Sequence, residues 1–208
     1  MGRVSDARER LIETAQKLIW ERSYRDVGVH EICQRSGVKP GSFYYFFPSK
    51  CHLAIAALEA GWQQVQNEVL DSAFAMNYSP LDRITRLFQV LYESQSLRQL
   101  NQERVVGCLF GSWVGELGEE DEAIRAKINE IFSGICKYFE SALEDAIALG
   151  LLDLEFENVA ASAKALLAYY EGVMLLARVK NDAEIIRTLT ANALKLIGAR
   201  NFEMVMES

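Results

Sequence analysis

The residues best equipped for chemistry lie between Gly37 and Lys50, where hydroxyl groups, lysines and glycines are close together. Ser42 can hydrogen-bond a base edge or a phosphate, and the hydroxyl of Tyr44 or Tyr45 is a good phosphate donor on a rigid arm. Lys50 follows a serine at the start of a predicted helix, where free amides and the positive helix end form an anion site. The stretch therefore favours recognition of a polyanion.

Two short helices are predicted to position these groups. The first ends at Ser36, and Gly37 follows at a place where a left-handed backbone suits a helix end. Pro40 fits the first position of the second helix, and Pro48 cannot continue that helix. Short helices joined by a turn that starts with glycine make a helix-turn-helix, whose second helix can lie in the DNA major groove.

The second helix has two distinct faces. Phe43 and Phe47 share one face and can anchor the helix to a core, whereas the polar residues point elsewhere. Gly41 lets the backbone come close to DNA, and Lys39 can reach a phosphate or a guanine edge.

At these residues the chain resembles TetR-family transcriptional regulators. The matching segments are Gly37-Val38, Gly41-Ser42-Phe43-Tyr44-Tyr45-Phe46-Phe47 and Pro48-Ser49-Lys50. The family usually has Ser or Thr at Gly28, Ser-Lys or Ser-Arg at Lys39-Pro40, and often His or Tyr at Phe46. The resemblance implies that DNA is contacted by Gly28, Lys39, Gly41, Ser42, Tyr44, Tyr45 and Lys50.

The charge distribution agrees with this interpretation. Residues 1–50 hold nine Lys or Arg against six Asp or Glu, a net charge of +3, and the remainder holds thirteen against twenty-three, a net charge of −10. The basic charge is therefore concentrated where DNA would bind, and the acidic remainder limits non-specific binding. Residues 1–10 are too charged for a signal peptide, so we expect a cytoplasmic protein.

No metal or cofactor is predicted. The four cysteines form no Cys-x-x-Cys pair and have no nearby histidine at metal-ligand spacing. The two histidines, His30 and His52, flank the predicted motif and are interpreted as surface residues. A small all-helical enzyme is the rival from another class, but the sequence has no Glu-x-x-His pair and no Gly-x-Ser-x-Gly. A third hypothesis is a dimeric scaffold that has lost DNA binding.

Helical periodicity continues through the whole chain and predicts an all-α fold. We expect an N-terminal three-helix helix-turn-helix DNA-binding domain over 1–48 and a C-terminal six-helix ligand-binding and dimerisation domain over 49–208. The predicted helices include one at about 105–116, one at about 157–179, and one capped by Asn181 that runs to about 197. The last two are amphipathic, and in the family they form the homodimer interface.

The predicted sensor lies in the C-terminal domain. Residues 107–112 resemble a Gly-Cys-Leu motif found in one branch of the family, with Ser112 in place of the usual Asn. The family's logic implies a small-molecule inducer that fills a helical cavity and releases a repressor dimer from a palindromic operator. The residues predicted to line the cavity are mostly aromatic: Trp62, Phe88, Tyr92, Cys108, Trp113, Tyr170 and Met174. An alternative is that Cys108 itself is alkylated or oxidised.

Overall fold

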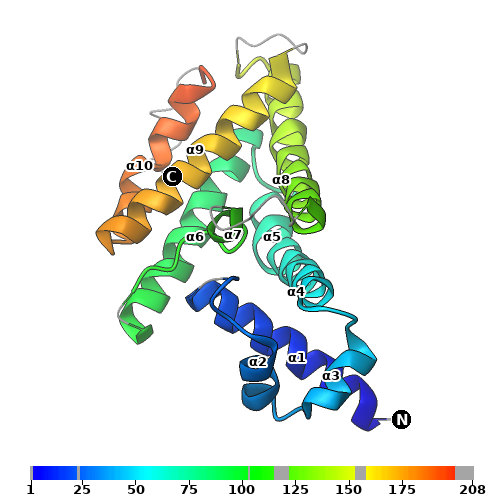
Figure 1. The fold of residues 1–208 in the computed structure, drawn as a ribbon. Helices are drawn as coiled ribbons and strands as arrows, with labels where there is room; N and C mark the ends of the chain where they lie inside the picture. Colours follow the sequence, from blue (N-terminus) through cyan, green and yellow to red (C-terminus); the bar gives the residue numbers. More distant parts are fainter. Residues whose placement is uncertain (1, 23, 103, 115–121, 153–157, 200–208) are drawn as a thin grey trace. The chain divides into compact units, whose positions relative to one another are not determined.

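The computed structural model describes residues 2–22, 24–102, 104–114, 122–152 and 158–199. In these ranges the chain is built from helices, with a single isolated bridge between Leu152 and Ala199, so the all-α prediction is confirmed. The elements in order (Figure 1) are α1 Gly2–Glu21, α2 Val29–Ser36, α3 Pro40–Phe46, α4 Lys50–Val65, the π-helix η1 Gln66–Leu70, α5 Asp71–Ala73, α6 Pro80–Gln102, α7 Gly111–Val114, α8 Glu122–Ala148, α9 Val159–Lys180 and α10 Glu184–Leu196.

Contacts divide the chain into two units, and the path of the chain passes between them three times. Unit 1 contains Met1–Gln64 and Leu109–Ile131, and unit 2 contains Val65–Cys108 and Phe132–Ser208. The predicted functional boundary between residues 48 and 49 stays a prediction.

Unit 1 is organised around α1, whose apolar stripe is buried. Leu11, Ala15 and Leu18 repeat at helical spacing and are almost fully removed from solvent. On the same helix, Gln16 donates its side-chain amide to the Ala57 carbonyl of α4 at 2.8 Å. This contact links α4 to α1 and gives the partly buried Gln16 amide a hydrogen-bond partner.

Unit 2 is organised around α6, which packs against α10 and η1, while α9 packs against α10. Phe88 of α6 is fully buried and lies against the ring of Tyr169, with 5.9 Å between ring centroids. Phe139 of α8 is also fully buried and meets Phe74 edge to face at 5.7 Å. These aromatic pairs form part of the apolar core of the unit.

Two predicted helices differ from those observed. The helix predicted at about 105–116 forms only over Gly111–Val114 of the described residues, because Gly107 has a left-handed backbone (φ 78°) that interrupts it. Residues 115–116 lie outside the described residues. Asn181 was predicted to cap the next helix, but it adopts φ 51° and ends α9, and the Glu184 amide donates instead to the Asp182 carboxylate at 2.9 Å.

Candidate functional site

The turn between α2 and α3 has the geometry that the sequence predicts. Gly37 follows Ser36 with φ 67° and ψ 24°, and the Val38 amide donates to the Cys33 carbonyl at 3.0 Å. Pro40 then begins α3, where its missing amide hydrogen leaves no helical bond unmade. The turn therefore sets the direction of α3 relative to α2.

Buried aromatic rings anchor α3 and leave the opposite face in solvent. Phe43 and Phe47 are buried, with ring centroids 6.0 Å apart. Tyr44 and Tyr45 are 63% and 79% exposed, and Ser42 is also exposed. Large exposed aromatic side chains on a short fixed helix are unusual on a free surface and are suited to contact a partner.

The same face borders a surface pocket of about 570 Å³ within unit 1. It is lined by Ala7, Arg10, Gly37, Val38, Lys39, Gly41, Ser42, Tyr45 and Phe46. Sequence reasoning missed Ala7 and Arg10. Arg10 lies next to Leu11, outside the buried stripe of α1, and its only described ion pair is a 3.9 Å contact with Asp6. The sequence indicates that Arg10 is an exposed arginine beside the apolar stripe of α1. It does not indicate that this arginine lies beside α3.

The start of α4 is where the sequence predicts an anion site, and there Lys50 has a local partner. Ser49 accepts from the His52 amide at 3.4 Å, and its hydroxyl lies 2.9 Å from His52 Nδ1. The Lys50 ammonium lies over the Tyr24 ring, 4.2 Å from its centroid. A cation held over an aromatic ring at a helix start keeps positive charge near the α3 face.

Gly28 caps α2 through its backbone alone. It has an extended conformation, its carbonyl accepts from the Ile32 amide at 3.1 Å, and no side-chain cap is present. An added side chain would meet nothing within 4 Å. The glycine is therefore not required by packing.

In unit 2, buried polar side chains hold the Gly107 segment against α6 and α9. Gln95 accepts from the Val106 and Gly107 amides at 3.1 and 3.4 Å and donates to the Gly107 carbonyl at 3.4 Å. The Val105 amide donates to the Asn181 side chain at 2.8 Å. A Cβ on Gly107 would lie 3.3 Å from Arg178 Cδ, so the segment passes close to α9. These bonds replace the helical bonds that residues 105–107 would otherwise form.

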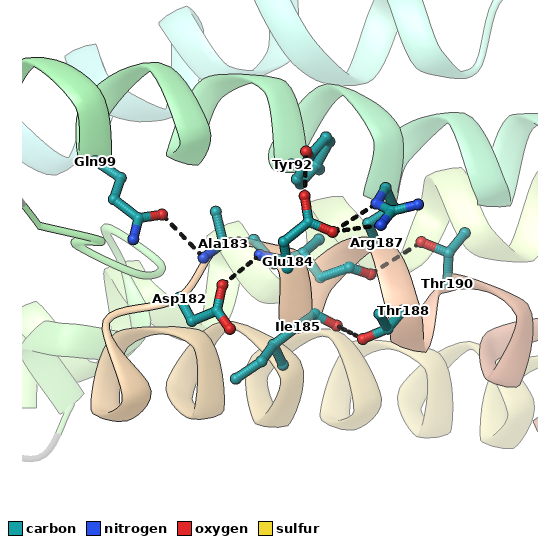
Figure 2. Close-up of polar contacts among 10 residues, drawn as sticks. Tyr92, Gln99, Asp182, Ala183, Glu184, Ile185, Arg187, Thr188 and Thr190 are labelled. Carbon is teal, nitrogen blue, oxygen red and sulfur yellow. Dashed lines mark hydrogen bonds and ion pairs between the residues drawn. The ribbon is translucent and has the colours of Figure 1, made fainter.

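The same side of α6 also holds the turn between α9 and α10 (Figure 2). Gln99 donates to the Asn181 carbonyl at 2.7 Å. It also accepts from the Ala183 amide at 3.2 Å. Tyr92 donates to the Glu184 carboxylate at 2.5 Å, which also pairs with Arg187. The hydrogen bond from Tyr92 contributes most to lowering the pKa of Glu184, and the one from Arg187 also lowers it. Helix α6 thus connects the Gly107 segment to the start of α10.

Cys108 ends the Val65–Cys108 segment of unit 2, and its thiol lies beside the titratable side chains of Tyr170 and Glu171. Its side chain is 8% exposed and hydrogen-bonds both Tyr170 and Glu171 of α9. Burial raises the pKa of Glu171, and the hydrogen bond from Cys108 opposes that shift. Glu171 Oε1 is buried with no hydrogen-bond partner among the described residues. Buried carboxyl oxygens are usually hydrogen-bonded, so this atom differs from most buried polar groups.

The other predicted ligand-binding residues fall in different units. Trp113 is buried in unit 1 and stacks on Tyr24 at 6.1 Å, while Trp62 meets Phe110 at 6.4 Å in the same unit. In unit 2, Phe88 is buried and Tyr92 hydrogen-bonds Glu184. Met174 and Tyr170 are buried on α9. Their common cavity remains a prediction.

Two family models match the chain. The model described as bacterial regulatory proteins, tetR family, matches residues 11–57, and the model of the tetracyclin repressor-like C-terminal domain matches residues 80–192. The chain belongs to the TetR family. The first match contains the turn and α3, and the second contains the Gly107 segment and most of α10.

Individual TetR-family relatives match over nearly the full length. The HTH-type transcriptional repressor NemR of Escherichia coli K12 is 29% identical over 196 residues, covering 92% of this chain and 94% of NemR. The transcriptional regulator AcuR of Cereibacter sphaeroides is 28% identical, covering 88% and 82%. The crystal structure of E. coli NemR in its reduced form superposes with a TM-score of 0.75 at 25% identity, covering 94% of this chain and 99% of that one. A regulatory protein TetR from Rhodobacter sphaeroides gives a TM-score of 0.79 at 25% identity, covering 91% and 98%.

TetR-family membership establishes the class of function. The chain is a DNA-binding transcriptional regulator and not an enzyme, and regulators of its family bind DNA operators and are generally ligand-responsive dimers. The exposed face of α3 lies in the part of the chain that matches the family's N-terminal domain.

Proposed function

We propose that this protein is a homodimeric, cytoplasmic repressor that binds a palindromic operator through α3 and is released by a small molecule. The observation that carries the proposal is the exposed Ser42, Tyr44 and Tyr45 face, fixed by the buried Phe43 and Phe47. The exposed hydroxyl groups supply phosphate and base-edge donors, and the buried rings keep the helix from turning. Gly28, Lys39, Gly41 and Lys50 complete the proposed DNA contacts.

The exposed apolar side chains of α9 and α10 support the proposed dimer. Leu175, Leu176 and Val179 of α9 and Leu196 of α10 are exposed in the single chain. By length and composition alone, helix α9 could cross a membrane. Only 33% of its most apolar 18-residue window is buried within the chain. In a family of dimeric regulators, a second copy accounts for this surface. The functional division proposed is DNA binding over 1–48 and sensing and dimerisation over 49–208.

Release of DNA requires only a difference in inducer affinity between two states. A coupling free energy of roughly 3 kcal/mol weakens operator binding by more than a hundredfold. The proposed inducer contacts are Trp62, Phe88, Tyr92, Cys108, Trp113, Tyr170 and Met174.

A second candidate for the signal is covalent modification of Cys108. Its contacts with Tyr170 and Glu171 favour this hypothesis, because a carboxylate beside the thiol is placed to accept its proton when the sulfur attacks an electrophile. The solved NemR relative is described as a reduced form. If Cys108→Ser leaves operator release by an electrophile unchanged, the covalent hypothesis is wrong.

A DNase I footprint on the DNA beside the protein's own gene tests the dimeric repressor. The expected result is two symmetric protected half-sites in successive major grooves, with centres roughly 34 Å apart. Sedimentation at the same concentration should show a dimer, and Leu176→Glu should reduce both the dimer and the footprint. A footprint made by a monomer over one half-site would contradict the proposal.

A further inference from the structure

A second pocket lies in unit 2 and contains none of the ligand-binding residues that the sequence predicts. It has a volume of about 310 Å³ and is lined by Phe74, Arg83, Lys137, Tyr138 and Ser141. These residues come from the segment after α5, from α6 and from α8. The volume is at the lower end of the range for small-molecule sites.

One wall of the pocket contains a buried arginine with donors to spare. Arg83 is 5% exposed, and it donates through Nη1 to Asp145 at 2.5 Å and through Nε to the Tyr78 carbonyl at 3.2 Å. A guanidinium has five N–H donors, so these two bonds fix its plane and leave donors for a ligand. The Asp145 carboxylate offsets the desolvation cost of the buried cation without lining the pocket.

A second cation has no such compensation. Lys137 is exposed on α8 and forms no ion pair with any described residue. It lies one helical turn from Ser141 and therefore on the same side of α8. No carboxylate lines the pocket. The lining is thus cationic, and Lys137 supplies the charge that is not already neutralised.

The remaining wall is aromatic. Phe74 and Tyr138 meet edge to face with 5.4 Å between ring centroids. The Tyr138 hydroxyl is already engaged, because it donates to Asp71 at 2.6 Å and accepts from Gln66 at 3.4 Å. Tyr138 therefore offers a ligand its ring and not its hydroxyl.

We propose that this pocket binds a small organic anion, a carboxylate attached to an apolar or aromatic body, through Arg83, Lys137 and the rings of Phe74 and Tyr138. The carboxylate matches the planar guanidinium and the ammonium, and the body of the ligand covers apolar surface. None of the lining residues is a proposed DNA contact, and the test of this site does not depend on operator binding.

The test is isothermal titration of the full chain with benzoate, and with benzamide as a neutral analogue of the same shape. Benzoate should bind at least tenfold more tightly than benzamide. Lys137→Ala should weaken benzoate binding about tenfold, whereas Lys137→Arg should retain most of it. Lys17→Ala, which removes an exposed lysine of α1, is the matched control and should not change the affinity.

A cavity-filling variant locates the site. Ser141→Leu places a larger side chain at an exposed position in the lining, so it should fold normally, as circular dichroism will check, and reduce benzoate binding. Arg83 is left unchanged because its buried ion pair with Asp145 supports the fold. Equal affinity for benzoate and benzamide, or wild-type affinity in Lys137→Ala, would overturn the proposal.

Discussion

Replacing Gly41 by alanine should separate folding from DNA binding. An ideal Cβ at this position meets nothing within 4 Å, and the glycine has no positive φ that an alanine would resist. Alanine is favoured over glycine in helices by up to about 1 kcal/mol, and we expect about half of that in the first turn of α3. For a chain of this size the melting temperature should rise by about 1–2 °C.

The same methyl group should weaken the complex with DNA. Gly41 lines the pocket beside α3, so the new methyl group lies where the backbone of α3 is proposed to approach DNA. We expect at least a tenfold loss of operator affinity, measured by fluorescence anisotropy, together with the small gain in melting temperature measured by calorimetry. Unchanged operator affinity would refute the close approach, and a drop of several degrees would refute the open space around Gly41.

Gly61→Ala provides the contrasting variant. Its Cβ would lie 2.8 Å from Leu109 Cδ2 and 3.2 Å from Gln16 Nε2. The methyl group must displace the ends of the Leu109 and Gln16 side chains, and this cost offsets the gain of alanine in a helix. Calorimetry should therefore show no rise in melting temperature for Gly61→Ala, in contrast to Gly41→Ala.

Further predictions concern unit 2. Gly107→Ala should lower the free energy of unfolding, measured by urea titration, by about 1–2 kcal/mol. Alanine disfavours a φ of 78°, and its Cβ would crowd Arg178. Gln95→Leu should cost about 2 kcal/mol in the same titration, since it leaves the buried Val106 and Gly107 amides without their acceptor. Burial raises the pKa of Glu171 in the folded state. Between the ordinary pKa of a glutamate and this raised pKa, the folded protein binds more protons than the unfolded chain. The free energy of unfolding should therefore fall as pH rises through that window. Melting temperatures of Glu171→Gln across pH 4–8 should lack this decline, and an identical pH profile would show that the carboxyl group is not buried in solution.

The helix-turn-helix could be predicted from sequence because its signals are local. Gly37 and Pro40 fix the turn, and Phe43 and Phe47 alternate with exposed residues at helical spacing. Each of these residues acts on its near neighbours in the chain. Arg10 could not be assigned in the same way, because its position beside α3 depends on how α1 packs.

The sensor region was harder to predict because distant side chains determine its structure. The segment before Gly111 contains apolar residues at spacings that suit a helix, but its amides bond to Gln95 and Asn181 instead. Asn181 was assigned to the wrong helix end because asparagine suits both an N-cap and a left-handed C-terminal position. The contact of Cys108 with Glu171 likewise joins residues far apart in the sequence.

The most direct test of the central claim is the affinity of the full chain for the DNA beside its own gene, compared with random duplex over a series of salt concentrations. The account predicts tight, salt-sensitive and sequence-selective binding that is lost in Tyr44→Ala and Lys50→Ala, with melting temperatures close to that of the unaltered protein. Equal affinity for both duplexes, or full operator binding by Tyr44→Ala, would contradict the claim that the exposed face of α3 recognises the operator.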